Sequence, residues 1–190
     1  MKMTAVEKRF VNSPGHTVQV AQRAQLLLDR VDYQPGWRYL DVGCGVGSSA
    51  CEIAKRSGMD VTGVDVDPAQ IEAAKARGAR PQPRFETMDA TQLNFRDAEF
   101  DIVASSKATH HIPRWEQAIS EMIRVLRPGG YLIYTDFMFP SWLVAAGRFI
   151  PFLAIPSKKR VEALATSAGL TKIYQSRSGL QFDFIWLRSS

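Results

Sequence analysis

The stretch Leu40-Asp41-Val42-Gly43-Cys44-Gly45-Val46-Gly47-Ser48 decides the fold of this chain. It joins a short predicted strand, Arg38–Val42, to a segment with helical character that runs to about Arg56. Glycines in such a turn let the backbone bend tightly and approach a ligand without a Cβ in the way. The following helix start offers free N–H groups and a positive partial charge. The stretch therefore predicts a strand–turn–helix unit that binds a nucleotide-like ligand.

The chain around this turn alternates strand and helix patterns with short connections, which is typical of an α/β fold around a largely parallel sheet. The last two predicted strands are joined only by Ser176–Gly179, too short for a crossover helix, so this pair should be antiparallel. Pro128-Gly129-Gly130 is expected to end a helix before the fifth strand. We expect strands at 38–42, 61–64, 84–88, 101–105, 131–134, 171–175 and 181–187, and helices at 17–31, 48–56, 68–77, 115–126 and 157–168.

Spacing separates this glycine turn from the dinucleotide fingerprint. That fingerprint, G-x-G-x-x-G, would need glycine where Ser48 stands, and the pattern here is G-x-G-x-G. Asp65 follows Gly43 by 22 positions at the end of the second strand, where a carboxylate accepts hydrogen bonds from two ribose hydroxyls. Met88-Asp89-Ala90 ends the third strand and is placed to contact an adenine. Asp89 taken alone is better explained as a turn or helix-capping carboxylate, and its place after the two other motifs favours the adenine contact.

Five segments together resemble the class I S-adenosylmethionine-dependent methyltransferases. They are LDVGCGVGS (40–48), GVDVDP (63–68), MDATQLNF (88–95), FDIV (100–103) and RVLRPGGYLI (124–133), and they span about half the chain. The resemblance implies a doubly wound, seven-stranded, mostly parallel sheet with the last strand antiparallel and helices on both faces. It also implies S-adenosyl-L-methionine as cofactor and S-adenosyl-L-homocysteine as product. It says almost nothing about the methyl acceptor.

The resemblance assigns cofactor contacts residue by residue. It places the methionine moiety along Gly43, Cys44, Gly45 and Gly47, ribose at Asp65, adenine stacking at Val66, and adenine contacts at Met88, Asp89 and Ala90. Asp41 is similar to the carboxylate that orients the glycine turn and approaches the cofactor's amino group. Ser105 lies where the family's fourth strand ends beside the methionine group. Cys44 is equally well explained as a small buried filler.

The candidate catalytic residues are His110 and His111, which follow the fourth strand. A histidine there can take a proton near neutral pH, and structural histidines at a helix start explain the pair equally well. Tyr33, Tyr39 and His16 are weaker candidates. Members of the family that methylate the amino group of adenine or the amide of glutamine carry the motif Asn/Asp-Pro-Pro-Tyr after the fourth strand. Ser105–Ala108 stands there instead, which disfavours that class.

The chain's composition predicts one globular domain. Its 190 residues are 45% hydrophobic and 23% charged, and a chain of this length buries about 70% of its unfolded surface. We expect a single domain over 1–190, with 1–37 as a helical cover and 38–190 as the core. The apolar segment 137–156 is expected on the substrate side, as a lid or a peripheral lipid contact. A packing helix or a dimer interface explains that segment equally well.

The charge of +5 is uneven, since residues 107–190 carry 11 Lys/Arg against 5 Asp/Glu. The one basic run, Lys158-Lys159-Arg160, fits a solvated helix start better than a nucleic-acid patch. Two cysteines, Cys44 and Cys51, form no zinc pattern, so we expect no metal and a reduced, cytoplasmic setting. No signal peptide is apparent in Met1–Val11, and no charge-free apolar piece approaches the ~20 residues of a membrane span.

The favoured function is methyl transfer to a small, apolar or aromatic molecule by a monomer or homodimer. The alternatives are a non-catalytic S-adenosylmethionine-binding scaffold, an RNA methyltransferase, and an NAD(P)-dependent oxidoreductase. Ser48 and the antiparallel final strands argue against the oxidoreductase. No recognised RNA-binding appendage supports RNA methylation, so nucleic acid is a disfavoured partner.

Overall fold

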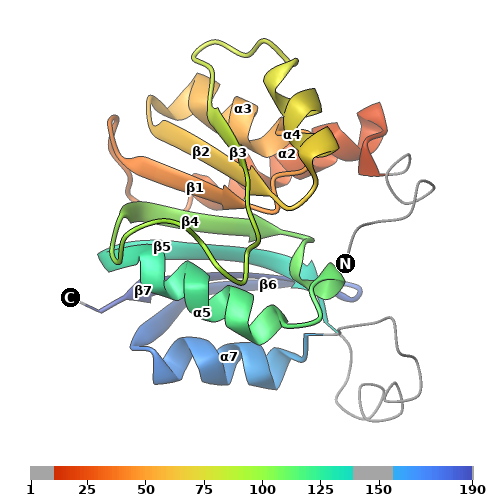
Figure 1. Cartoon of the computed structure of the whole chain (residues 1–190). Coiled ribbons are helices and arrows are strands. Elements are labelled where there is room, and N and C mark those ends of the chain that lie inside the picture. The colour runs from red at the N-terminus through yellow and green to blue at the C-terminus, as the bar shows by residue number, and fades with distance from the viewer. Residues whose placement is uncertain (1–10, 139–155, 190) are drawn as a thin grey trace.

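A computed structural model describes residues 11–138 and 156–189 of the chain. Its central feature is a seven-stranded sheet with strand order β3-β2-β1-β4-β5-β7-β6 (Figure 1). β7 runs antiparallel to both neighbours, β5 and β6, and the other neighbouring pairs are parallel. The expected sheet and its antiparallel final pair are therefore confirmed. The strands are β1 (Arg38–Val42), β2 (Asp60–Asp65), β3 (Arg84–Thr87), β4 (Phe100–Ser106), β5 (Leu126–Phe137), β6 (Leu170–Ser178) and β7 (Gln181–Arg188).

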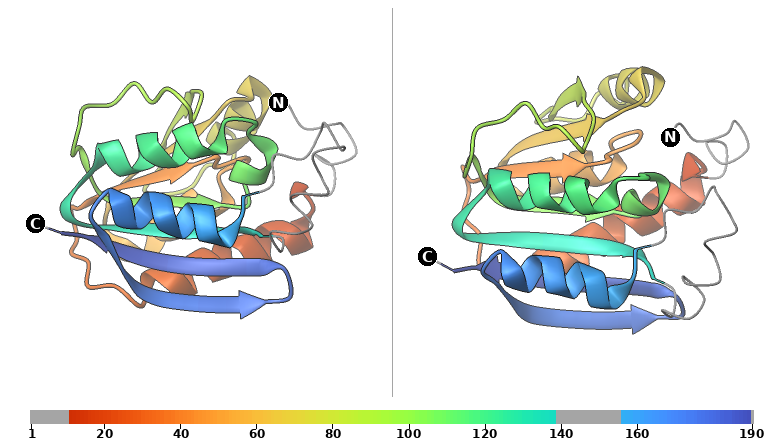
Figure 2. Two further views of the ribbon diagram at one scale, coloured as in Figure 1. Left: turned by 90° about the horizontal axis from the view of Figure 1, so that it is seen from below. Right: turned by 60° about the horizontal axis from the view of Figure 1, so that its bottom comes forward.

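Helices cover both faces of the sheet (Figure 2). One face carries α2 (Pro14–Leu28), α3 (Ser48–Ser57) and α4 (Pro68–Lys75), and the other carries α5 (Trp115–Val125) and α7 (Lys158–Ser167). Successive strand residues point to opposite faces, so a central strand must be apolar on both sides. In β4, Ile102 packs in the core beneath α2, α3 and α4, and its neighbour Val103 packs in the core beneath α5 and α7.

Local sequence explains where most helices begin and end. Pro68 opens α4, and the Asp67 carboxylate caps that helix by accepting a hydrogen bond from the Ala69 N–H at 3.1 Å. Ser157 caps α7 by accepting from the Arg160 N–H at 3.3 Å, and Gly169, with a φ of +79°, follows its end. These boundaries agree with the sequence expectation. The first helix begins three residues earlier than expected, because Pro14 is a favourable first helical residue.

The fifth strand differs from its prediction. Helix α5 ends at Val125, and strand β5 begins at once at Leu126 instead of after the Pro-Gly-Gly stretch. Between the pairs Phe100–Leu126 and Ile102–Tyr131 the register shifts, so residues 127–130 bulge from the ladder. A Cβ at Gly130 would lie 2.6 Å from the carbonyl oxygen of Asp101. The glycine is therefore needed for close backbone approach within the strand.

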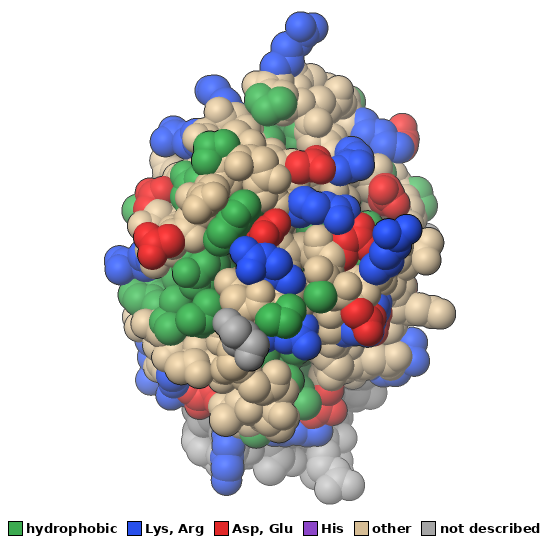
Figure 3. Space-filling view, turned by 90° about the vertical axis from the view of Figure 1, so that its left-hand side faces the viewer, with side chains coloured by type: hydrophobic (Ala, Val, Ile, Leu, Met, Phe, Trp, Pro, Cys, Tyr) green, Lys and Arg blue, Asp and Glu red, His purple; other side chains and the backbone are tan. Residues whose placement is uncertain are grey.

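The amino ends of the parallel strands form a face with mixed charge. Figure 3 shows acidic and basic side chains interspersed there. Arg127 Nε donates to Asp101 at 2.6 Å, and Arg38 pairs with Glu99 at 2.5 Å. Arg124 forms ion pairs with Asp97 and Glu121. These basic residues are thus engaged by carboxylates. Most of the expected apolar segment 137–156, namely residues 139–155, lies outside the described residues.

Candidate functional site

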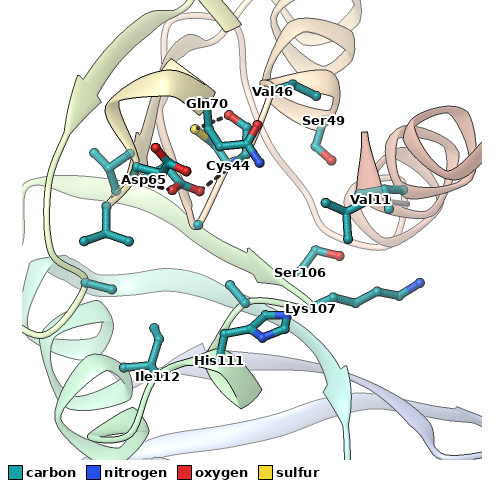
Figure 4. A pocket seen from close by; sticks show the side chains of 18 of the residues that line it. Val11, Cys44, Val46, Ser49, Asp65, Gln70, Ser106, Lys107, His111 and Ile112 are labelled. Atoms are coloured by element: carbon teal, nitrogen blue, oxygen red, sulfur yellow. Dashed lines mark hydrogen bonds between the residues drawn. The ribbon is translucent and has the colours of Figure 1, made fainter. Parts of the chain in front are cut away.

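A pocket of about 950 Å³ opens at the carboxyl ends of the parallel strands (Figure 4). The strand order reverses between β1 and β4, and ligands of open α/β sheets bind at such a switch point. The start of α2 and the loops that follow β1, β2, β3 and β4 line the pocket, together with Phe137 at the end of β5. The pocket therefore brings together the segments that the sequence singled out.

The glycine loop after β1 forms one wall and is held by Asp65. The Asp65 carboxylate accepts hydrogen bonds from the Gly45 N–H and the Asp67 N–H, each at 2.9 Å. The Gly43 N–H donates to the Val64 carbonyl oxygen at 2.8 Å. These bonds fix the loop that follows β1 to the end of β2, so the Asp65 carboxylate and the glycine loop share one wall of the pocket.

The loop after β3 forms the next part of the wall. Asp89 accepts hydrogen bonds from the N–H and the hydroxyl of Thr91, both at 2.8 Å. The Thr91 N–H is the main cause that lowers the pKa of Asp89. Val66 is 46% exposed on the pocket rim, and Met88 and Ala90 line the same side. An exposed apolar side chain beside a carboxylate suits a flat heterocycle that has polar edges.

Some buried polar atoms of the pocket have no partner among the described residues. They include Ser48 Oγ and Gln70 Nε2, which line the pocket, and Oδ2 of Asp41 beneath the glycine loop. Buried polar groups are nearly always hydrogen-bonded in native proteins. The orphaned donors and the space left by the glycines therefore fit a bound, polar, nucleoside-like ligand.

Asp41 is a buried carboxyl group whose proton affinity is unusual. Burial, followed by the charge of Asp65, raises the pKa of Asp41 to about 7. A hydrogen bond from the Ala50 N–H lowers the pKa of Asp41 but does not cancel this rise. Its side chain is 4% exposed and does not line the pocket. Asp41 therefore influences the site from beneath the glycine loop, through its field and through the loop's position.

Not every expected site residue reaches the pocket. Gly43, Cys44 and Gly45 line the pocket, whereas Gly47 does not. A Cβ on Gly47 would lie 2.6 Å from the ring of Phe85, so this glycine faces the core. The Ser105 hydroxyl donates to the Val42 carbonyl oxygen at 2.9 Å and is buried. Its neighbour Ser106 lines the pocket instead, since adjacent strand residues face opposite ways.

The thiol and phenol candidates are buried or partly buried side chains. Burial raises the pKa of the Cys44 thiol well above its usual value. The Cys44 Sγ also fills the space over Gly63, where a Cβ would lie 3.0 Å from the sulfur. Tyr39 is fully buried in the core, and Tyr33 packs against the same core. His16 lines the pocket, and its ring Nδ1 lies 3.0 Å from the Val11 carbonyl oxygen.

The loop after β4 brings two histidines into the pocket. The short helix η1 (Thr109–His111) carries both, and both line the pocket. His110 Nδ1 lies 2.5 Å from the Asp136 carboxylate, and the ring packs edge-on against Phe137 with centroids 5.4 Å apart. Figure 4 shows His111 on the same side of the pocket as Lys107. Asp136, at the end of β5, was not found from sequence because it matches no motif.

Asp136 is buried and saturated with donors. One oxygen accepts from the N–H and hydroxyl of Thr109, at 2.9 and 2.5 Å, and from the His110 N–H at 3.2 Å. The other accepts from the Phe137 N–H at 2.7 Å and faces His110 Nδ1. The Thr109 hydroxyl also lies 2.5 Å from the phenol of Tyr134, whose pKa is raised by burial. The network fixes η1 to the end of β5.

Lys107 is a pocket residue that no sequence motif indicates. It lines the pocket with a φ of +54°, a conformation that is uncommon for residues other than glycine. Its Nζ lies 5.5 Å from the centroid of the Phe137 ring. Burial, followed by the charge of Arg23, lowers the pKa of Lys107. Among the described residues no carboxylate lies within 4.0 Å of its Nζ.

Helix α2 covers the pocket and is fastened to the antiparallel end of the sheet. Arg23 forms an ion pair with Asp183 on β7, and Asp183 also accepts from the hydroxyl of Thr135 at 3.0 Å. Burial tends to raise the pKa of Asp183, but its hydrogen bonds with Arg23, Ser176 and Thr135 leave it below the ordinary value. This attachment brings the first turns of α2 over the glycine loop.

Two further properties concern the described ranges, 11–138 and 156–189. No group of three or more His, Cys, Asp or Glu side chains in these ranges is arranged to hold a metal ion. No helix within them has both the length and the apolar character needed to cross a membrane.

The family model described as a methyltransferase domain matches residues 40–134. Methyltransferase GfsG of Streptomyces halstedii is 35% identical over 156 residues, covering 76% of this chain and 56% of that protein. A demethylmenaquinone methyltransferase of Renibacterium salmoninarum is 33% identical over 150 residues, covering 79% and 59%. A sterol 24-C-methyltransferase of Yarrowia lipolytica is 35% identical over 126 residues, covering 64% and 33%. The chain thus spans a third to about three fifths of the length of these relatives.

Solved structures agree on the fold. The PH0226 protein of Pyrococcus horikoshii superposes with a TM-score of 0.76 at 22% identity, over 94% of this chain and 93% of that one. The cyclase SpnF superposes with a TM-score of 0.77 at 20% identity, over 89% and 81%. Because one of these neighbours is named a cyclase, the fold by itself does not fix an activity.

Proposed function

The chain belongs to the class I S-adenosylmethionine-dependent methyltransferases, and from this premise we propose that it transfers a methyl group from that cofactor to a small, largely apolar molecule. The observation that carries the proposal is one continuous pocket that runs from Asp65, through the glycine loop, to His110. One end of this pocket suits a nucleoside, and the other end offers apolar and basic side chains.

The residues of the nucleoside end suit S-adenosylmethionine. Asp65 would accept hydrogen bonds from the ribose hydroxyls, since it lies beside the glycine turn and at the carboxyl end of β2. Val66 would cover one face of the adenine, with Asp89 and Met88 at its edge. The loop at Gly43 and Gly45 leaves room for the methionine moiety, and the Asp41 carboxylate lies beneath it.

When bound, the cofactor supplies a methyl group that its sulfonium has already made electrophilic. The protein must therefore hold the acceptor in line with that group and keep water out. The acceptor end is lined by Val11, Val20, Ile112 and Phe137 together with Lys107 and both histidines. This mixture favours an acceptor with an apolar body and a polar reacting end.

The names of the relatives support a small-molecule acceptor. Two of them are named as acting on demethylmenaquinone and on 2-methyl-6-phytyl-1,4-hydroquinone, and others as sterol methyltransferases. Each of these acceptors has a large apolar part. We infer that substrate choice in this chain depends on the start of α2 and on the segment that follows Phe137, because the loops after β1, β2 and β3 would hold the cofactor.

Titration calorimetry with S-adenosylmethionine and S-adenosylhomocysteine tests the cofactor half of the proposal. Both ligands should bind, and D65N should weaken binding about 10- to 100-fold, since it removes charge-assisted hydrogen bonds to the ribose. NAD+ should give no heat of binding. D60N is the matched control: Asp60 begins the same strand, at the end away from the pocket, and is half exposed. No binding of either ligand to the wild-type protein would refute the proposal.

A further inference from the structure

The pocket holds a histidine–carboxylate pair at its acceptor end. The Nδ1 edge of the His110 ring faces the Asp136 carboxylate. The same ring lines the pocket, and 22% of the His110 side chain is exposed. The Thr109, His110 and Phe137 N–H groups can only donate, so Asp136 accepts hydrogen bonds from all three. His110 Nδ1 lies 2.5 Å from the oxygen that also accepts from the Phe137 N–H, so we assign the hydrogen between the two groups to Nδ1.

The tautomer follows from this arrangement. When Nδ1 of a neutral imidazole carries the proton, Nε2 has a free lone pair. No hydrogen bond from a described residue occupies Nε2 of His110. The ring's two nitrogens point in different directions, so the edge that carries Nε2 faces away from the buried carboxylate. His110 is therefore held in the form that accepts a proton, on the side where the ring is open.

The position of this pair relative to the cofactor half is fixed by close packing. A Cβ at Gly43 would stand 2.3 Å from the Cβ of Ala108, so the loop that carries His110 lies directly against the glycine loop. The proton acceptor thus borders the part of the pocket where the methionine moiety would lie.

We propose that His110 is the general base for the methyl acceptor and that Asp136 is its positioning residue, so that the acceptor is a molecule with an aromatic or enolic hydroxyl group. This inference rests on the proposed function. A neutral amine can attack an electrophilic methyl carbon with its own lone pair and needs no base beforehand. A hydroxyl group of a phenol or enol becomes a strong nucleophile only when its proton is removed.

The step balances within the site. His110 Nε2 takes the hydroxyl proton, the electron pair left on the acceptor forms the new bond to the methyl carbon, and the pair of the broken carbon–sulfur bond leaves on the sulfur. The imidazolium that results is stabilised by Asp136, whose carboxylate stays hydrogen-bonded throughout. The proton then passes from Nε2 to solvent when the product leaves.

Lys107 stabilises the charge that the proton leaves behind. Its Nζ and the His110 ring lie 5.5 and 5.4 Å from the same Phe137 centroid, so both flank one apolar surface. Lys107 and His110 both line the pocket beside this ring, where a cation can stabilise the deprotonated acceptor. Of the charged groups near Lys107, Arg23 and Asp183 neutralise each other, and Asp136 is enclosed by its donors.

The first test needs no acceptor. Nitrogen-15 NMR of the whole protein should show His110 with a strongly downfield Nδ1–H signal and an unprotonated Nε2. H110Q should remove that signal and H111Q should keep it, which assigns it. D136N should abolish the downfield shift or move the proton to Nε2, because an amide can donate to Nδ1. A His110 ring protonated on Nε2 in the wild type would overturn the proposal.

The second test uses two acceptors of one shape, naphthol and naphthylamine, with release of S-adenosylhomocysteine as the readout. Naphthol should be methylated and naphthylamine should not. H110Q should lower kcat about 100-fold or more, and D136N about tenfold or more with KM little changed. K107M should lower the rate with naphthol, whereas D60N, remote from the pocket, should keep it.

The outcomes separate the two proposals. Faster transfer to naphthylamine, unchanged rates in H110Q, or transfer to neither compound by a protein that binds S-adenosylmethionine would overturn the base and the acceptor class. Because His110 and Asp136 lie outside the nucleoside end, the variants H110Q and D136N should bind the cofactor with an affinity within about twofold of wild type. Absence of cofactor binding in the wild type would instead refute the proposed function itself.

Discussion

Gly43 and Ala108 are in such close contact that a Cβ on the glycine would lie 2.3 Å from the Cβ of the alanine. Gly43 begins the turn after β1, and Ala108 precedes the helix η1 that carries both histidines. This one contact therefore fixes the distance between the nucleoside end and the acceptor end of the pocket.

Gly43→Ala should separate these two loops. The φ of +77° disfavours any side chain, and the clash adds to that strain, so we expect a loss of about 2–4 kcal/mol of folding free energy. Affinity for S-adenosylmethionine should fall at least tenfold. Gly45→Ala is the matched control: its φ is +52°, but nothing lies within 4 Å of the added Cβ, and it should cost about 1 kcal/mol. Urea unfolding gives both values; equal losses would contradict the contact's role.

Asp41 should make stability fall as pH rises. Its pKa is raised from 3.8 to about 7, so between those values the folded state binds a proton that the unfolded state has lost. The slope is at most about 1.4 kcal/mol per pH unit from this one group. Asp183 and Asp89, whose pKa values are lowered, act in the opposite sense and lose stability on acidification.

The difference between wild type and Asp41→Asn isolates this effect. Because asparagine cannot ionise, the variant should gain stability relative to wild type as pH rises from about 4 to about 7, with little further gain above. Thermal unfolding at several pH values measures the difference. A difference that does not vary with pH would show that Asp41 ionises as an ordinary carboxyl group.

Removing Arg23 should release helix α2 from the sheet. Arg23→Met leaves the buried Asp183 carboxylate with only hydroxyl and amide donors, which should cost about 2–3 kcal/mol at neutral pH, allowing for the partial exposure of Arg23. The loss should shrink in acid, where the carboxyl group is protonated. The double variant R23M/D183N should be more stable than R23M alone. Strict additivity of the two single changes would contradict direct pairing.

Thr109→Val should disrupt the network behind His110. It removes the hydroxyl that faces both Asp136 and Tyr134 at 2.5 Å, and leaves two buried polar groups short of a partner. The expected loss is about 2–4 kcal/mol by urea unfolding. Thr109→Ser keeps the hydroxyl and should stay within about 1 kcal/mol of wild type. A loss for T109S as large as that for T109V would attribute the effect to packing of the methyl group.

Local sequence determined the scaffold of this protein. The strand β1, the helix α3 and the glycine turn between them follow from the stretch 40–48, since turn and cap preferences act over a few residues. The spacing from Gly43 to Asp65 likewise predicted two loops side by side, because parallel strands end at one edge of the sheet. The antiparallel final pair followed from a short linker.

Only the tertiary structure decided which side chains reach the pocket. Ser106 lines it in place of Ser105, because a shift of one residue along a strand reverses the direction of the side chain. Asp136 and His110 stand 26 positions apart and meet because β4 and β5 are paired in register at Ser106–Thr135. Contacts of this kind depend on strand order and register, which no local pattern encodes. The sequence therefore determined where the nucleoside end lies, and the sheet decided what faces the acceptor.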